Sequence, residues 1–116
     1  MKIAVVGSRE IMPNIEKIIR DIQKITDEKP IIISGGAKGT DQQAKIAAKK
    51  MEWEYIEYRP NYELYGTPAT IIRNRQIIEQ AEYVLAYWNG ESKGTAQAIE
   101  YAKKKKKKGI VKIPKE

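Results

Sequence analysis

The residues best suited to bind a ligand stand in four short segments at the ends of apolar runs or the starts of helical patterns. They are GSR at 7–9, SGGAKGTD at 34–41, RNR at 73–75 and WNGESKGT at 88–95. Glycines allow a ligand close to the backbone, and hydroxyls and helix-start amides bind anions. Arginine adds bidentate contacts to phosphate or carboxylate. The combination predicts a site for a phosphate-bearing ligand.

We expect the contacts to that ligand to come from these segments. The candidate residues are Gly7, Ser8, Arg9, Ser34, Gly35, Gly36, Gly39, Thr40, Asp41, Arg73, Asn74, Trp88, Gly90, Ser92, Gly94 and Thr95. The alternative for each glycine-rich loop is an ordinary strand-to-helix turn capped by Thr or Asp. Two such loops together with Ser8 and Arg9 favour a ligand. Neither loop has the Walker A or the G-x-G-x-x-G spacing, which argues against a standard ATPase or NAD-binding turn.

Three of the candidate side chains have two interpretations each. Asp41 could bind a ribose hydroxyl or stabilise the start of its own helix. Asn74 could bind a base or ribose, or cap the preceding loop. Trp88 could stack on a base or cover the core at a strand end. Tyr62 and Tyr65 share the ambiguity of Trp88, on a loop that could close over the site.

Residue types that are missing exclude several kinds of site. The chain has no Cys and no His. Thiolate and imidazole metal sites, Ser-His-Asp hydrolases and Cys-His proteases are therefore excluded. We expect no metal and no cofactor apart from a nucleotide-like ligand.

The positive charge is concentrated in one place. Lys and Arg number 22 against 15 Asp and Glu, for a net charge of +7, and six of those seven excess charges belong to the lysine run 103–108. An excess of this kind suggests a nucleic-acid partner. The run also falls where the last helix is expected to end, where cations suit the helix dipole. Its position, away from the predicted ligand site, leads us not to favour nucleic acid.

Apolar runs alternate with amphipathic stretches along the whole chain. Continuous or alternating apolar patterns predict strands at 3–6, 31–33, 53–58, 83–88 and 110–113. Helical spacing predicts helices at 13–25, 40–51, 68–80 and 95 to about 107, with a loop at 59–67 and Gly109 as the last helix cap. No apolar stretch approaches the 18 residues of a membrane span, so we expect no membrane partner and a cytoplasmic location.

This alternation predicts an α/β fold. We expect a single domain over residues 1–116, built as a three-layer, Rossmann-like, doubly wound parallel sheet of five strands in the order 3-2-1-4-5. Ligands bind such sheets at the carboxyl ends of the strands, where the strand order reverses. That rule independently selects 7–9 and 88–95.

The ordered set of motifs resembles the SLOG superfamily, the Rossmann-like fold shared by SMF/DprA and LOG proteins, and within it the small YspA-like branch. SGGAKGTD at 34–41 is also similar to a stretch of the DprA family. The matching residues are 6–9, 34–41, Ala44, Pro60, 65–66, 73–74, Ile77, 86–90, Ser92 and 94–95.

The resemblance implies a domain that binds or senses a nucleotide or a nucleotide-derived small molecule. It also implies association into a homodimer through helices beside the sheet. Some branches are enzymes that cleave N-glycosidic bonds with the Glu of a G-T-x-x-E pattern. Here Ala98 takes that position, and Glu100 is displaced by roughly 200° around a helix, which argues against an enzyme.

Two alternatives to ligand sensing stay open. One is a nucleotide N-glycosidase or base-exchanging transferase, for which Asp41, Glu91 and Glu100 are the candidate carboxylates. The other is DprA-like binding of nucleic acid, suggested by the net charge and by SGGAKGTD.

Overall fold

Short β-branched runs form the strands of one parallel sheet. The structure is a computed structural model that describes residues 1–113. Its strands are β1 (Lys2–Gly7), β2 (Ile31–Ser34), β3 (Glu54–Glu57), β4 (Tyr83–Tyr87) and β5 (Lys108–Lys112). They lie in the order β3-β2-β1-β4-β5, and every neighbouring pair is parallel. The predicted fold class and strand order are confirmed.

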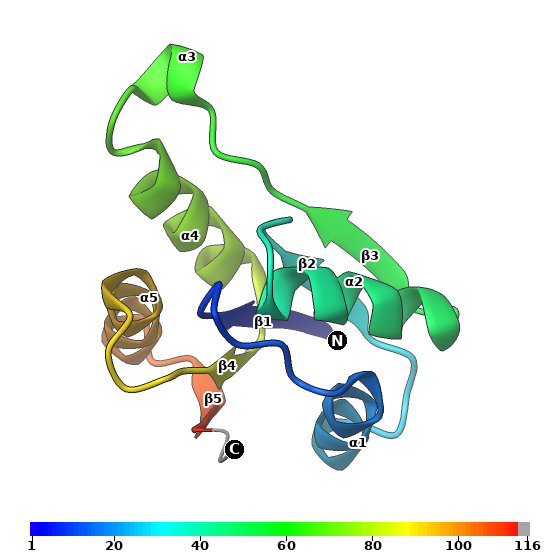
Figure 1. The fold of residues 1–116 in the computed structure, drawn as a ribbon. Coiled ribbons are helices and arrows are strands. Elements are labelled where there is room, and N and C mark those ends of the chain that lie inside the picture. The colour runs from blue at the N-terminus through cyan, green and yellow to red at the C-terminus, as the bar shows by residue number, and fades with distance from the viewer. Residues whose placement is uncertain (114–116) are drawn as a thin grey trace.

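Helices cover both faces of this sheet (Figure 1). They are α1 (Ile15–Ile25), α2 (Thr40–Lys50), α3 (Tyr62–Tyr65), α4 (Ala69–Gln80) and α5 (Lys93–Lys104). Side chains of a strand alternate between the two faces. Ile3 and Val5 of β1 therefore pack with α1 and α2, whereas Ala4 and Val6 pack with α4 and α5. The small residue Ala4 and the alanines of α5 bring that helix close to the sheet.

The last helix ends earlier than its periodicity predicts. Helix α5 stops at Lys104, and Gly109 lies in β5 instead of capping the helix, so that prediction is wrong. The chain turns at Lys106, whose φ is 57°. Gly109 meets a packing requirement, since a Cβ there would lie 2.7 Å from the carbonyl oxygen of Val84. The lysine run 103–108 thus covers the helix end, the turn and the first residue of β5.

Helix α3 occupies part of the predicted loop 59–67. Asn61 caps it by accepting a hydrogen bond from the Leu64 amide at 3.0 Å. Figure 1 shows this short helix standing away from the sheet, beyond the start of α4. Tyr62 and Leu64 are 57% and 68% exposed. A single turn of helix therefore presents apolar side chains to solvent above one end of the sheet.

The register places the ligand-binding segments at one edge. Gly7 at the end of β1 pairs with Tyr87 at the end of β4. From that edge the chain runs to α1 on one face and to α5 on the other. Within residues 1–113, no helix is both long and apolar enough to cross a membrane.

Candidate functional site

A cleft opens at the carboxyl edge of the sheet, beside the ends of β1 and β4, where the strand order reverses. Its volume is about 260 Å³. All four segments with candidate chemistry contribute to it. The predicted residues that line the cleft are Gly7, Arg9, Gly35, Asp41, Arg73, Asn74, Ser92, Gly94 and Thr95.

Arg73 lies at the floor of the cleft and is only 6% exposed. Its Nη1 donates to the carbonyl oxygens of Gly35 at 2.9 Å and Tyr58 at 3.4 Å. Its Nε donates to Asn74 Oδ1 at 2.8 Å. No buried side-chain nitrogen or oxygen in the described part of the chain lacks a partner. Nη2 makes none of these three bonds, and the Arg73 side chain lines the cleft.

The charge of Arg73 is balanced on one side by Asp41. Burial lowers the pKa of Arg73, and the neighbouring Asp41 carboxylate opposes that effect. Arginine nevertheless stays charged at any physiological pH. Arg9 is near enough to lower the pKa of Arg73 further. Two guanidinium groups thus share the cleft, one fixed by hydrogen bonds and one exposed.

Asp41 is a buried carboxyl group in the first turn of α2. Its Oδ2 accepts a hydrogen bond from the Ala37 amide at 3.2 Å. Burial raises the pKa of Asp41, while the hydrogen bond from the Ala37 amide and the charge of Arg73 oppose the rise. Asp41 therefore holds its own loop and faces Arg73, and its charge is sensitive to anything that enters the cleft.

Two glycines of the site are required by close packing between elements. A Cβ at Gly7 would lie 2.3 Å from Thr40 Oγ1, and one at Gly35 would lie 2.6 Å from Arg73 Nη1. Both distances are shorter than real Cβ contacts allow. These glycines let β1 meet the start of α2 and let Arg73 reach the carbonyl oxygen of Gly35. Packing within the protein therefore accounts for glycine at both positions, without any need for a ligand.

Gly94 differs from them, because a Cβ there would meet nothing within 4 Å. It lies in the first turn of α5 and lines the cleft. No side chain caps α5, so the amides of its first turn are left for solvent or a ligand. The positive end of the helix dipole also favours an anion beside these amides. The start of α5 therefore presents donors across the cleft from Arg73.

Hydroxyl groups lie beside these amides. Ser92 Oγ and Thr95 Oγ1 are 3.4 Å apart, and Ser8 Oγ lies 3.5 Å from Thr95 Oγ1. Ser8 is 1% exposed, whereas Ser92 is partly exposed. A chain of three hydroxyls thus runs from the end of β1 to the start of α5.

The predicted residues outside the cleft lining have structural contacts. Ser34 Oγ donates to the carbonyl oxygen of Val5 at 2.9 Å. Thr40 Oγ1 donates to the carbonyl oxygens of Ser8 at 3.4 Å and Ile11 at 3.3 Å. Both side chains are fully buried. Ser34 joins the ends of β1 and β2, and Thr40 joins the start of α2 to the loop after β1.

The remaining predicted residues lie in the loops. Gly36 and Gly39 have φ values of 75° and 80° in the loop between β2 and α2. The indole Nε1 of Trp88 donates to the carbonyl oxygen of Ser92 at 3.0 Å, and the ring packs on the α4–α5 side of the core. Gly90 lies in an exposed turn. Trp88 therefore supports the α5 loop.

Sequence reasoning missed several residues that line the cleft: Val6, Glu10, Ala37, Thr70, Ile77 and Ala98. Helical spacing could have found two of them. Thr70 lies three residues before Arg73 on α4, and Ala98 lies three residues after Thr95 on α5, so each shares a face with a predicted residue. Glu10 and Ala37 had only their position beside predicted residues as a signal.

The carboxylates around the cleft do not match the G-T-x-x-E pattern of the N-glycosidases. Ala98 brings a methyl group to the cleft at the position of the Glu in G-T-x-x-E, while Glu100 lines a different depression between α4 and α5. Glu10 and Asp41 are the acidic residues of the cleft lining. Within residues 1–113, no group of three His, Cys, Asp or Glu side chains could hold a metal ion.

The family follows from a match over the first half of the molecule. Residues 1–61 match the family model of DNA recombination-mediator protein A, and they include β1, β2, α2 and the SGGAKGTD loop. The chain belongs to this family. No curated protein matches the chain.

Solved structures of this family share the fold. DNA processing protein A (DprA) from Helicobacter pylori, described for its single-stranded DNA binding mode, is 20% identical with a TM-score of 0.77. DprA from Streptococcus pneumoniae is 22% identical with a TM-score of 0.79. The alignments cover 100% and 99% of this chain but 66% and 50% of those proteins. The chain thus spans one half to two thirds of their length.

A third structure extends the likeness beyond DprA. TM1055, a structural genomics target, is 19% identical with a TM-score of 0.66, over 93% of this chain and 71% of that protein. The predicted membership of the superfamily that unites DprA and LOG proteins is confirmed. The narrower assignment to a YspA-like branch, and the predicted homodimer, stay predictions.

Proposed function

We propose that the cleft binds single-stranded DNA by holding a backbone phosphate between the two arginines and the start of α5. Arg73 carries the proposal, because it is a buried guanidinium that lines the cleft and whose Nη2 takes no part in the hydrogen bonds that fix Nε and Nη1. Arg9 and the uncapped amides at Gly94 lie around the same cleft. Preorganised donors of this kind suit an oxyanion.

The rim of the cleft suits a nucleic-acid base. Tyr62 Oη lies 3.1 Å from Oγ1 of Thr70, a residue of the cleft lining. The tyrosine is 57% exposed, on the projecting helix α3. Exposed aromatic rings beside phosphate-binding groups are typical of surfaces that bind single strands. A phosphate in the cleft and a base against Tyr62 would be compatible.

Family membership supports the same partner. The Helicobacter pylori neighbour is described for single-stranded DNA binding, and both DprA neighbours superimpose on nearly the whole chain. Because this chain spans only part of their length, further activities of those proteins are not carried over.

A second candidate is a nucleotide-derived small molecule in the same cleft. The observation that favours it is the cleft itself, whose volume of about 260 Å³ is close to the lower end of the usual range for small-molecule sites. Such a space suits a single nucleotide or a part of one. The phosphate chemistry would be the same for both partners, and a sensor of free nucleotides would use the same residues.

Fluorescence anisotropy with a labelled 12-nucleotide oligothymidylate tests the proposal. We expect Arg9→Gln to weaken binding about fivefold or more, since a charge-assisted contact is lost. Arg20→Gln on α1 removes the same charge from the other face of the sheet and should change affinity less than twofold. Competition with thymidine monophosphate separates the candidates. The DNA proposal is overturned if the mononucleotide binds at least as tightly as the oligomer, or if the oligomer does not bind.

A further inference from the structure

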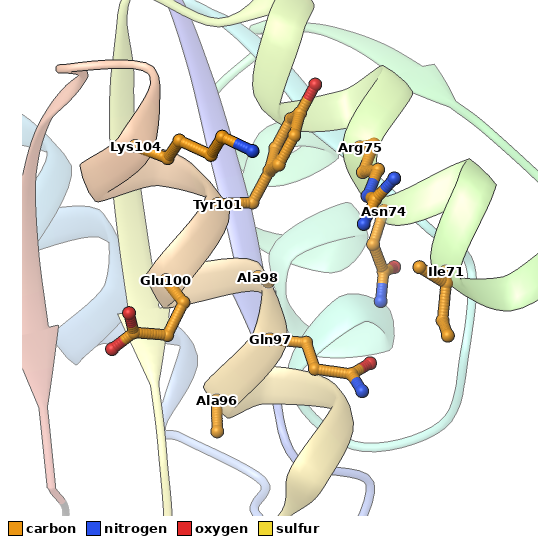
Figure 2. A pocket seen from close by; sticks show the side chains of 9 residues that line it. All are labelled: Ile71, Asn74, Arg75, Ala96, Gln97, Ala98, Glu100, Tyr101 and Lys104. Atoms are coloured by element: carbon orange, nitrogen blue, oxygen red, sulfur yellow. The ribbon is translucent and has the colours of Figure 1, made fainter.

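A second depression adjoins the cleft on the α4–α5 side of the molecule (Figure 2). It is a groove of about 460 Å³ between the two helices. Asn74 and Ala98 line both the cleft and this groove, so the two spaces are adjacent. The other groove residues are Ile71, Arg75, Ala96, Gln97, Glu100, Tyr101 and Lys104.

The RNR segment connects the two spaces. Arg73 faces the cleft, Asn74 lies at the junction and Arg75 lines the groove. Asn74 Oδ1 accepts the hydrogen bond from Arg73 Nε, which leaves the amide NH₂ group to donate. In Figure 2, Asn74 on α4 faces Gln97 on α5 across the groove. Polar donors therefore continue from the phosphate site into the groove.

Cations flank the aromatic ring of the groove. The guanidinium carbon of Arg75 lies 5.2 Å from the centroid of the Tyr101 ring, and Nζ of Lys105 lies 5.5 Å from it. Cation–π contacts hold these side chains in place while they stay exposed. The Tyr101 hydroxyl donates to Glu79 Oε1, which also fixes the position of the ring.

The carboxylate of Glu100, also in the groove lining, points away from α4 in Figure 2. The positive charge then increases towards the end of α5. Lys104 lines the groove, and the lysine run 103–108 begins at the same helix end. Helix α5 starts at the cleft and is roughly 18 Å long, which is enough for several nucleotides. Its charge therefore complements a polyanion lying along the helix.

We propose that a single strand of DNA held in the cleft continues along the α4–α5 groove towards the lysine run 103–108. This inference rests on the proposed function, since the strand enters through the phosphate site. Arg75 and Lys104 contact successive phosphates, and the run 103–108 extends the field that attracts the strand. The groove thereby makes affinity depend on the length of the strand.

The test compares a labelled trinucleotide with a labelled 12-nucleotide oligothymidylate. The variant is Arg75→Gln with Lys104→Gln. The matched control is Arg20→Gln with Lys49→Gln, which removes one Arg and one Lys from exposed positions on α1 and α2. We expect the groove variant to weaken 12-nucleotide binding about fivefold or more while trinucleotide binding changes less than twofold. The slope of log K against log salt should fall by about 1.4 for two lost phosphate contacts.

The outcomes separate this inference from the proposed function. If Arg9→Gln weakens both oligomers but the groove variant binds the 12-nucleotide strand like the wild type, the groove inference is overturned and the cleft stands. If neither oligomer binds the wild type, the proposed function and the groove inference are both overturned. Sedimentation of wild type and groove variant is the second readout. A change of mass between them would identify the groove as an interface between copies of this chain and overturn its assignment to DNA.

Discussion

Nη1 of Arg73 donates to the carbonyl oxygen of Gly35 at 2.9 Å, which joins helix α4 to the loop after β2. The two residues are 38 positions apart in the sequence. The contact is as close as it is because Gly35 has no Cβ. The same guanidinium supports the loop and supplies charge to the cleft.

Arg73→Lys should destabilise the protein by about 2 kcal/mol. A lysine ammonium cannot reproduce the fork that contacts Gly35, Tyr58 and Asn74, so a buried carbonyl oxygen loses its charged donor. Urea denaturation measures the change. Arg75→Lys, at an exposed position of the same helix, should cost less than about 0.5 kcal/mol. Equal midpoints for the two variants would contradict a supporting role for Arg73.

Gly7→Ala should cost about 2 kcal/mol in the free energy of unfolding, since the added Cβ overlaps the Thr40 side chain. In a Thr40→Gly background, which removes the overlapping Cβ, Oγ1 and Cγ2 atoms together, the same change should cost at least about 1 kcal/mol less. A double-mutant cycle by chemical denaturation measures this coupling. Additive effects would show that the close approach of these two residues is not what requires glycine.

Most of the fold could be predicted because it depends on local patterns. The runs at Ile3–Val6 and Ile31–Ile33 are short and β-branched, and their alternation with helical spacing leads to the order β3-β2-β1-β4-β5 through the rules of parallel crossovers. The end of α5 could not be predicted in the same way. Lysines are good helix formers, and only the pairing of β5 with β4 draws residue 108 into a strand.

The sequence predicts which segments line the cleft, but it does not predict the contacts between them. The topology brings the ends of β1, β2 and β4 together, so any chemistry at those ends shares a cleft. The requirement for Gly7 and Gly35 comes from Thr40 and Arg73, which are distant in sequence and belong to other elements. Contacts of this kind have no signature in spacing.

Gly94→Ala should separate stability from binding. With nothing within 4 Å of the new Cβ and a helical position, the variant should gain about 0.5 kcal/mol in stability. The methyl group would enter the cleft beside the α5 amides, so we expect affinity for the 12-nucleotide strand to fall about threefold or more. Gln42→Ala, at an exposed position on α2, is the control that should leave binding unchanged. A Gly94→Ala protein that binds normally would place the strand elsewhere.

Binding should strengthen as the pH falls from 7 to 4, towards the ordinary pKa of an Asp carboxyl group. Burial raises the pKa of Asp41, and a phosphate in the cleft disfavours its charged form further. Protonation of Asp41 then removes the repulsion between its carboxylate and the bound phosphate. The DNA phosphodiester stays ionised over this pH range. The chain has no histidine, the side chain that ordinarily titrates in this window. We expect about a threefold gain in affinity, absent from Asp41→Asn. An equal gain in both proteins would contradict this origin.

The raised pKa of Asp41 also determines how the folding stability changes with pH. A carboxyl group whose pKa is higher in the folded state favours folding most below its unfolded pKa, and this contribution is lost as the pH rises through the folded value. Urea midpoints of the wild type relative to Asp41→Asn should therefore decline with increasing pH across that range. A rise in the relative midpoint would contradict the dominant effect of burial.

Amide chemical shifts during titration with a trinucleotide test the central claim most directly. The account predicts that the ¹H–¹⁵N signals of Gly94 and Thr95 shift with saturation, while the signals of α1, on the other face of the sheet, do not move. Unchanged signals for Gly94 and Thr95, with shifts confined to the lysine run 103–108, would contradict a phosphate site in the cleft and indicate binding by charge alone.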